Sequence, residues 1–297
     1  NEMKIAVIGT GALGGYYAAR LAHAGGEVHC LCRSDYDAVA RDGLRVKSCD
    51  GDFEAKVHAH CKPKTIGVSD LVIVGVKTTS NESVPSLLKP VVGSGTILLT
   101  FQNGLGNEEL LHRHYPGDQI MGGVCFLCSN RTGPGRIHHI AHGHIQVAEF
   151  SGGIRERTQR ISAMFSRAKV RCEAKESLGE IRWRKLVWNI PFNGLSITAN
   201  GATVEDILED PELLQTTKTL MAESIATANR EGHAIPGEFI QQNIDYSSNM
   251  GSYKTSMQLD FEAGKPLEIE SIIGEPLRRA KKAGVDAVAM QELYSTI

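Results

Sequence analysis

The chain has 297 residues, 41% hydrophobic and 22% charged, a composition that excludes a disordered, collagen-like or coiled-coil protein. Its 32 basic and 34 acidic side chains give a net charge of −2, without the positive excess of most proteins that bind nucleic acids or anionic membranes. The length favours two domains. Because no apolar run reaches the roughly 18 residues of a membrane span and no signal-peptide pattern opens the chain, we expect a soluble cytoplasmic protein that acts on a small molecule. Its seven scattered cysteines are expected to be free thiols.

Short apolar segments separated by a helical pattern mark the first part of the chain. The segments Met3–Ile8, Val28–Cys32 and Leu71–Val76 predict strands of a parallel sheet that helices cover on both faces. Between the first two, Leu13–Ala24 is rich in helix formers and ends before Gly25-Gly26, a pair suited to a helix C-terminus. The pattern predicts a βαβ unit.

The pattern changes from strands to helices near residue 172. Thr96–Phe101, Gln119–Ser129 and Gly135–Val147 predict further strands, and Gly143 is predicted to turn a hairpin. Apolar residues that recur three and four positions apart then predict helices over Ile181–Leu195, Pro211–Glu231, Glu238–Ser247, Ser256–Glu262, Glu268–Lys282 and Ala287–Tyr294. The sequence therefore predicts an α/β protein, with a Rossmann-type doubly wound sheet in residues 1–174 and an all-helical substrate domain in residues 175–297.

A glycine fingerprint follows the first predicted strand. In Gly9-Thr10-Gly11-Ala12-Leu13-Gly14, the first glycine permits a tight turn, the second lets the backbone approach a pyrophosphate, and the third lets helix pack on strand. The helix N-terminus also offers N–H groups to phosphate oxygens. The position between strand and helix indicates a dinucleotide site that includes Gly9, Gly11 and Gly14.

The end of the second strand indicates which dinucleotide binds. An NAD site usually places Asp or Glu about 20 residues beyond the fingerprint. This chain has Cys32-Arg33-Ser34 there. Because a guanidinium can bind a 2′-phosphate and a carboxylate would repel it, Arg33 predicts NADP(H).

Two more polar side chains follow predicted strands. Lys77 comes after Leu71–Val76, and Asn103 belongs to the Gln102-Asn103-Gly104 turn after the strand that ends at Phe101. In doubly wound sheets, ligands bind outside the carboxyl ends of the strands. We therefore expect both residues beside the cofactor.

Two clusters contain residue types that bind metals. Cys125 and Cys128 are three apart in a predicted strand and are expected to face opposite sides. The histidines around the predicted Gly143 turn are interpreted as polar edge residues: His138, His139, His142 and His144. We predict no metal site.

The stretch Trp183–Asn193 is the most informative part of the second domain. Lys185, Asn189 and Asn193 are spaced four apart, so a helix places them on one face. Pro191 is predicted to kink this helix. By itself the pattern is also that of a solvated stripe on an amphipathic helix.

Together, the glycine fingerprint with Arg33, the Gln102-Asn103-Gly104 turn, the Lys185 series and Ser256-Met257 followed by Glu268 resemble the ketopantoate reductases (2-dehydropantoate 2-reductases). The resemblance spans nearly the whole chain. It implies a Rossmann domain that binds NADPH, a helical domain that closes over it, and reduction of 2-dehydropantoate to (R)-pantoate on the route to coenzyme A.

The resemblance also implies roles for individual residues. Lys185 is the expected catalytic lysine and Glu268 its acidic companion. Asn103, Asn189, Asn193 and Ser256 are expected to contact substrate; Arg33 and Lys77 are expected to reach the cofactor, as is Asn103.

Two departures from the family pattern leave alternatives open. The chain has Met257-Gln258-Leu259-Asp260 where the family often has Met-Leu-Gln-Asp, and Ile273 replaces an asparagine before Gly274. The first alternative is reduction of another small 2-keto acid. The second is a non-catalytic nucleotide-sensing protein that keeps the Rossmann domain. The sequence does not set the oligomeric state and leaves a homodimer open.

Overall fold

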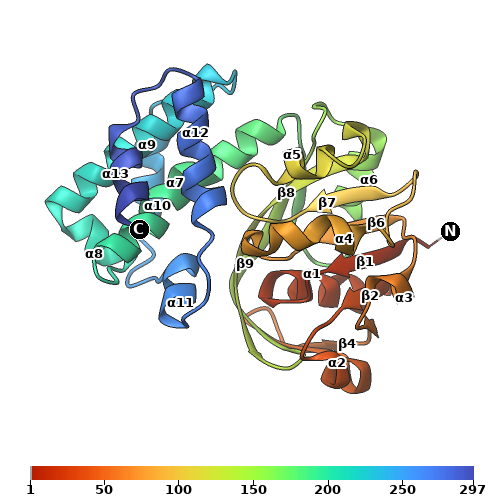
Figure 1. Ribbon diagram of the computed structural model, residues 1–297. Helices are drawn as coiled ribbons and strands as arrows, with labels where there is room; N and C mark the ends of the chain where they lie inside the picture. The colour runs from red at the N-terminus through yellow and green to blue at the C-terminus, as the bar shows by residue number, and fades with distance from the viewer. Residues whose placement is uncertain (1) are drawn as a thin grey trace. The chain divides into compact units, whose positions relative to one another are not determined.

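The computed structural model describes residues 2–297, which form two compact units (Figure 1). Unit 1 comprises the residues up to Gln102 and Asn107–Leu178, and unit 2 comprises Asn103–Gly106 and Gly179–Ile297. The predicted boundary between residues 174 and 175 assigns the segment 103–106 to the first domain. In the structure this short segment packs with the helices of unit 2, where Leu105 is buried in the core.

Unit 1 is built on one mixed sheet. Its strand order is β4-β3-β9-β8-β7-β6-β1-β2-β5, and β10 pairs with β9. The strands are β1 (Lys4–Ile8), β2 (Glu27–Leu31), β3 (Leu44–Ser48), β4 (Phe53–Ala55), β5 (His58–His60), β6 (Leu71–Val74), β7 (Ile97–Thr100), β8 (Ile120–Gly133), β9 (Arg136–Glu149) and β10 (Cys172–Lys175). The stretch β2-β1-β6-β7 is parallel throughout, which confirms the Rossmann-type part of the sheet.

Helices cover both faces of the parallel stretch. They are α1 (Ala12–His23), α2 (Tyr36–Asp42), α3 (Pro63–Ile66), α4 (Val84–Leu88), α5 (Asn107–His112) and α6 (Glu156–Arg167). Along β1, Ile5 and Val7 join the core beneath α1 and α6, whereas Ala6 and Ile8 join the core that includes residues of α4 and α5. Each strand is therefore buried on both sides, which is why the sequence shows unbroken apolar runs.

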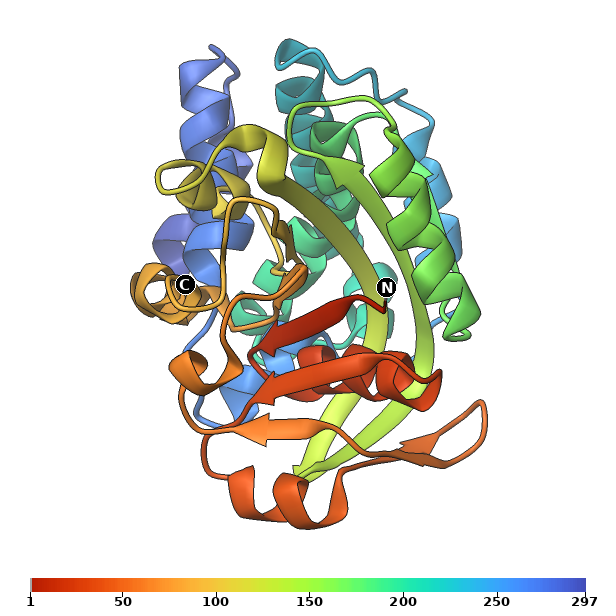
Figure 2. The same cartoon turned by 90° about the vertical axis from the view of Figure 1, so that its right-hand side faces the viewer.

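The hairpin of β8 and β9 differs from its prediction. Its turn lies between Gly133 and Arg136, and Figure 2 shows its two strands as long curved ribbons in yellow-green. Gly143 does not turn a hairpin. It lies inside β9, where Phe126 pairs with His144 and Leu127 with His142, so Gly143 is the extra residue of a β-bulge. Glycine suits this position because its φ is 128°.

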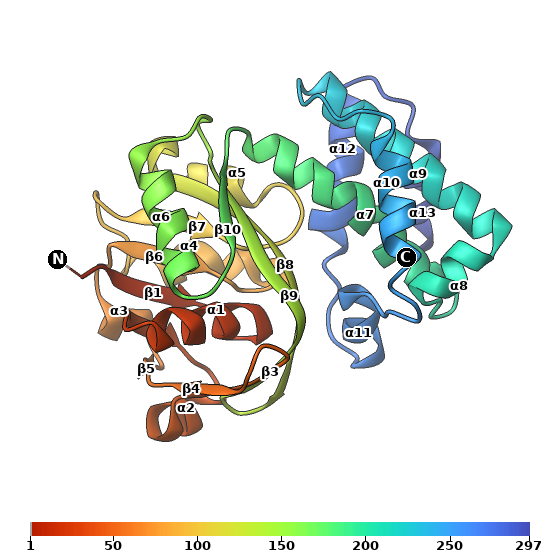
Figure 3. The same cartoon turned by 180° about the vertical axis from the view of Figure 1, so that it is seen from behind.

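The interpretation of the neighbouring histidines as polar edge residues is wrong for His139. Its side chain is fully buried, because β3 pairs with β9 on one side and Tyr16 of α1 packs against its ring. The sequence analysis predicted no strand over the residues of β3, which cover this side of β9. Figure 3 shows β3 beside β9 at the lower end of the hairpin.

Unit 2 is helical, as predicted. Its elements are α7 (Leu178–Thr198), α8 (Val204–Glu209), α9 (Pro211–Arg230), α10 (Phe239–Ser247), α11 (Ser256–Glu262), a π-helical turn (Glu270–Gly274), α12 (Glu275–Lys282) and α13 (Val288–Thr296). Apolar residues of α7, including Trp183, Val187 and Ile190, form the core with residues of α9, α12 and α13. The helix α7 continues through Pro191. None of the described helices is long and apolar enough to cross a membrane.

Candidate active site

The three fingerprint glycines meet different steric demands in the turn between β1 and α1. Gly9 has a φ of 104°, and a Cβ atom there would lie 2.5 Å from the Val76 backbone nitrogen. A Cβ atom on Gly14 would lie 1.9 Å from the Gly9 carbonyl oxygen. By contrast, a Cβ atom on Gly11 would meet nothing within 4 Å. Gly9 and Gly14 therefore shape the turn, whereas Gly11 keeps space open in front of it.

This turn has the features of an anion-binding helix N-terminus. Gly11 is the N-cap of α1, no acidic residue lies in the first turn of that helix, and the backbone N–H groups there favour an anion. The Thr10 hydroxyl donates a hydrogen bond of 2.9 Å to the Leu31 carbonyl, which ties the turn to the end of β2. Sequence reasoning missed this role of Thr10 because its partner is a backbone oxygen 21 residues away.

Arg33 is exposed just beyond the end of β2. Nearby, the buried Asp35 carboxylate lies 3.6 Å from Nε of Arg131 on β8. Arg131 therefore offsets a negative charge that would oppose phosphate binding next to Arg33. Burial raises the pKa of the Cys32 thiol to about 11, so this neighbour is uncharged near neutral pH. Nothing in the sequence linked Arg131 to Asp35, since they are far apart in the chain.

Lys77 and the glycine turn lie at the same edge of the sheet, because β1 and β6 are parallel neighbours and both residues follow the strand ends. Lys77 is exposed. The buried Gln102 fixes this edge: its Nε2 donates to the Val76 carbonyl at 3.1 Å and to Asn81 Oδ1 at 2.7 Å. Sequence reasoning quoted Gln102 only as part of a motif and missed its positioning role.

In unit 2, Nζ of Lys185 donates a hydrogen bond of 2.7 Å to Oδ1 of Asn103. Asn103 is held by the segment that follows it. The Leu105 N–H donates to the Ser271 carbonyl at 2.9 Å. A Cβ atom on Gly104, whose φ is 83°, would lie 2.1 Å from the same oxygen. The close backbone contact with Ser271 therefore requires glycine and fixes the amide that binds the lysine.

The other two members of the series Lys185, Asn189 and Asn193 lie deeper in unit 2. Asn189 and Asn193 follow Lys185 on α7, and both are buried. Oδ1 of Asn193 accepts a hydrogen bond of 3.1 Å from the Met257 backbone nitrogen in the first turn of α11. Asn193 therefore positions α11, whose first residue is the exposed Ser256. A direct contact of Asn189, Asn193 or Ser256 with substrate stays a prediction.

Glu268 is buried at 7% exposure and lies two residues before the π-helical turn. Its backbone carbonyl accepts from the Ile272 N–H at 3.3 Å and from the Ser271 hydroxyl at 3.4 Å. Ser271 thus connects the turn that carries Glu268 with the segment that carries Asn103. Such π-turns are rare and occur frequently at functional sites.

The described residues thus provide two sets of groups, one in each unit. Unit 1 offers backbone N–H groups, Arg33 and Lys77 at one edge of a parallel sheet. Unit 2 offers the ammonium of Lys185, amide groups and a buried carboxylate. The fold and the glycine turn define a Rossmann-type protein with an appended helical unit.

The chain belongs to the ketopantoate reductase family. Residues 5–152 match the family model Ketopantoate reductase PanE/ApbA, and residues 177–297 match Ketopantoate reductase PanE/ApbA C terminal. A 2-dehydropantoate 2-reductase from Nostoc sp. is 44% identical over 300 residues, which cover 99% of this chain and 94% of the relative.

Solved structures agree with this family. The 2-dehydropantoate 2-reductase of Geobacter metallireducens has a TM-score of 0.96 and 42% identity, with 99% of this chain and 98% of that chain covered. A D-mandelate dehydrogenase solved with NADH and anilino(oxo)acetate has a TM-score of 0.89 at 20% identity, covering 99% and 96%. At that identity the likeness is one of fold.

Proposed function

We propose that this chain reduces the ketone of 2-dehydropantoate with NADPH to give (R)-pantoate. The observation that carries the proposal is the hydrogen bond between the Lys185 ammonium and the Asn103 amide, because it holds a proton donor at a defined position. The membership of the chain in the ketopantoate reductase family supports the choice of substrate.

The glycine turn and Arg33 support the choice of cofactor. Gly11 leaves space for a pyrophosphate, and Gly9 and Gly14 permit the turn that presents the N-terminus of α1. Arg33 would bind the 2′-phosphate, and Lys77 would bind phosphate or ribose oxygens at the same edge. When bound, the nicotinamide supplies the hydride.

Lys185 would supply the proton. As C2 of the keto acid gains the hydride and its C=O π bond breaks, the ketone oxygen would take a proton from Nζ of Lys185. The neutral amine then regains a proton from water. A positioned donor of this kind typically contributes about 10²–10⁴-fold to the rate. Asn103 orients the ammonium by accepting a hydrogen bond from it through Oδ1.

Glu268 and the remaining polar groups would position the substrate. We propose that the Glu268 carboxylate accepts a hydrogen bond from the substrate hydroxyl, and that Asn189 and Ser256 bind substrate oxygens. Asn193 would act partly through α11, whose first turn it holds.

A panel of 2-keto acids with NADPH oxidation as the readout tests this function. We expect the highest kcat/KM for 2-dehydropantoate. Faster reduction of another keto acid would replace the substrate and keep the reaction. Cofactor binding without turnover of any keto acid would instead support a nucleotide-sensing protein.

We also propose a cytoplasmic setting and a homodimer. All seven cysteines are free thiols in the structure, which supports a reducing compartment. Light scattering of the purified chain measures its mass in solution, and a monomer mass would contradict the homodimer.

A further inference from the structure

A cysteine, an aspartate and a histidine that the proposed function does not use lie together in unit 1. Cys49 and Asp50 follow β3, and His139 lies in β9. The backbone fixes their positions, because Ser48 pairs with His139 in the sheet and the Cys49 N–H donates to the His139 carbonyl at 3.1 Å. One potential ligand atom from each of the three residues lies within 4.8 Å of the others.

The orientation of the His139 ring is set by its second nitrogen. Nε2 lies 2.6 Å from the His142 carbonyl oxygen, so it must carry the proton and donate. The φ of His142 is 61°, an uncommon value for a residue other than glycine, in the bulge that presents this carbonyl. In the neutral imidazole, Nδ1 then keeps a lone pair. Histidines that bind metals usually donate their other N–H to such a carbonyl or carboxylate.

The distances around Nδ1 are close to those of a tetrahedral zinc site. Nδ1 of His139 lies 3.8 Å from the Cys49 sulfur and 3.9 Å from Oδ2 of Asp50. Ordinary Zn–S, Zn–N and Zn–O bond lengths separate such ligand atoms by about 3.4 to 3.6 Å. All three ligand atoms lie within 4.8 Å of one another, and movement of the two exposed side chains, Cys49 and Asp50, would bring them to the ion.

We propose that Cys49, Asp50 and His139 form a binding site for Zn²⁺. The Cys49 thiol would release its proton to solvent and bind as a thiolate, Asp50 would bind through one carboxylate oxygen, and His139 through Nδ1. The Ser48 hydroxyl, which lies 2.8 Å from Nδ1, would give up this contact to the ion. Water would fill the fourth position, since three protein ligands leave it open.

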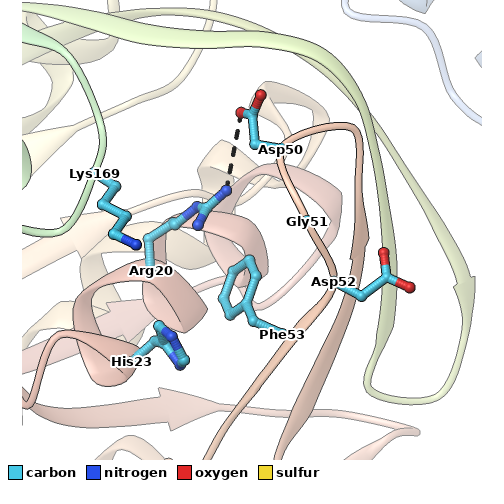
Figure 4. Close-up of a pocket in the computed structure, with 7 residues that line it drawn as sticks. All are labelled: Arg20, His23, Asp50, Gly51, Asp52, Phe53 and Lys169. Carbon is cyan, nitrogen blue, oxygen red and sulfur yellow. Dashed lines mark ion pairs between the residues drawn. The ribbon is translucent and has the colours of Figure 1, made fainter.

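Cys49 and Asp50 are exposed, so an ion can reach them from solvent. Asp50 lines a hollow of about 340 Å³ together with Arg20, His23, Gly51, Asp52, Phe53 and Lys169 (Figure 4). The Arg20 guanidinium forms an ion pair with Oδ2 of Asp50 at 4.0 Å, a distance too long for a hydrogen bond, and the zinc ion would compete with it for this oxygen (Figure 4). Bound zinc would join the turn after β3 to β9. None of the residues proposed for catalysis belongs to the site, so the inference does not depend on the proposed function.

The test uses the metal-free full chain and its Cys49→Ser variant. Calorimetric titration with ZnCl₂ should show one ion per chain, and Cys49→Ser should weaken binding about 100-fold. Titration with Co²⁺ should give a thiolate-to-cobalt charge-transfer band that Cys49→Ser abolishes. The matched control is Cys61→Ser, because Cys61 is also an exposed free thiol.

Asp50→Asn gives a second test that keeps the thiol, and we expect about 10-fold weaker binding of Zn²⁺. Equal zinc affinity in the parent chain and Cys49→Ser would overturn the proposal. So would the loss of the cobalt band in Cys61→Ser, which would place the thiolate ligand elsewhere. Absence of stoichiometric binding to the parent chain would do the same.

Discussion

The glycine turn of unit 1 and the lysine site of unit 2 are built in opposite ways. The turn is made of backbone, and its three glycines lie within six residues of one another. The lysine site is made of side chains from α7, the segment 103–106 and the region before α12, which only tertiary packing brings together. Local sequence therefore specifies the first site almost completely, whereas the second depends on contacts between distant residues.

The largest expected effect is at the lysine site of unit 2. Lys185→Ala should lower kcat by about 100-fold or more, since the proton donor is removed, while NADPH affinity changes little. Steady-state kinetics and fluorescence titration measure the two quantities. Lys282→Ala, an exposed lysine at the end of α12, is the control and should keep full activity. A loss of only a few-fold in Lys185→Ala would remove the lysine from the reaction.

The glycine turn of unit 1 is tested by the same substitution, glycine to alanine, at two positions. Gly14→Ala places a methyl group against the Gly9 carbonyl and should lower the free energy of unfolding by about 3 kcal/mol. Gly11→Ala meets no atom and should stay within about 0.5 kcal/mol of the parent, yet weaken NADPH binding about 10-fold or more because the methyl fills the space for the pyrophosphate. Urea unfolding and cofactor titration separate these effects. Equal destabilisation of both variants would contradict the distinct roles.

Arg33 tests whether a side chain adds specificity to the backbone site. Arg33→Ala should weaken NADPH binding about 10-fold and leave NADH binding nearly unchanged, because only NADPH carries the 2′-phosphate. The ratio of the two dissociation constants is the measurement. If both cofactors lose affinity equally, Arg33 does not discriminate between them.

Asn193 tests the dependence of the lysine site on distant packing. Asn193→Ala leaves the buried Met257 N–H without its acceptor and should lower the free energy of unfolding by about 1–2 kcal/mol. Asn249→Ala, at an exposed position after α10, should change it by less than about 0.5 kcal/mol. Urea unfolding compares the two variants, and equal values would show that Asn193 does not hold α11.

A smaller effect concerns the outer edge of the sheet in unit 1. Burial, followed by the neighbouring His29 and His58, lowers the pKa of His60 below 6.5. The folded state therefore disfavours the charged imidazole of His60. The folding stability that His60 contributes is fully present above pH 6.5 and is lost as the pH falls through the lowered pKa.

The free energy of unfolding at a series of pH values measures this effect. His60→Gln should reduce the loss of unfolding free energy below pH 6.5. Substitution of the exposed His114 by Gln should leave the dependence of this free energy on pH unchanged. An unaltered acid profile in His60→Gln would contradict the role of this histidine.

The sequence predicted the elements whose signals are local. The apolar runs of β1, β2, β6 and β7 are buried on both faces, and the helices of unit 2 except α8 have a regular apolar spacing. The short strands β3, β4 and β5 were missed because they carry charged and histidine residues at the sheet margin. Gly143 was misread because a glycine in a bulge and a glycine in a turn meet the same backbone demand.

In the candidate site too, the sequence predicted the features whose signals are local. The fingerprint singled out Gly9 and Gly14, where a Cβ atom would meet backbone, whereas the pyrophosphate contact of Gly11 stays a prediction. The structural tasks of Thr10, Gln102 and Ser271 depend on partners that lie far away in the chain. Residue spacing placed Lys185 and Asn193 on one helix. It gave no sign that Asn193 holds the backbone of α11.

Transfer of deuterium from NADPH to substrate is the decisive measurement of the proposed reaction. NADPH deuterated at both C4 positions of the nicotinamide is incubated with 2-dehydropantoate and the full chain, and mass spectrometry and NMR locate the label. We expect one deuterium at C2 of (R)-pantoate, at a rate that Lys185→Ala lowers about 100-fold. Pantoate without deuterium at C2, or no pantoate at all, would contradict it.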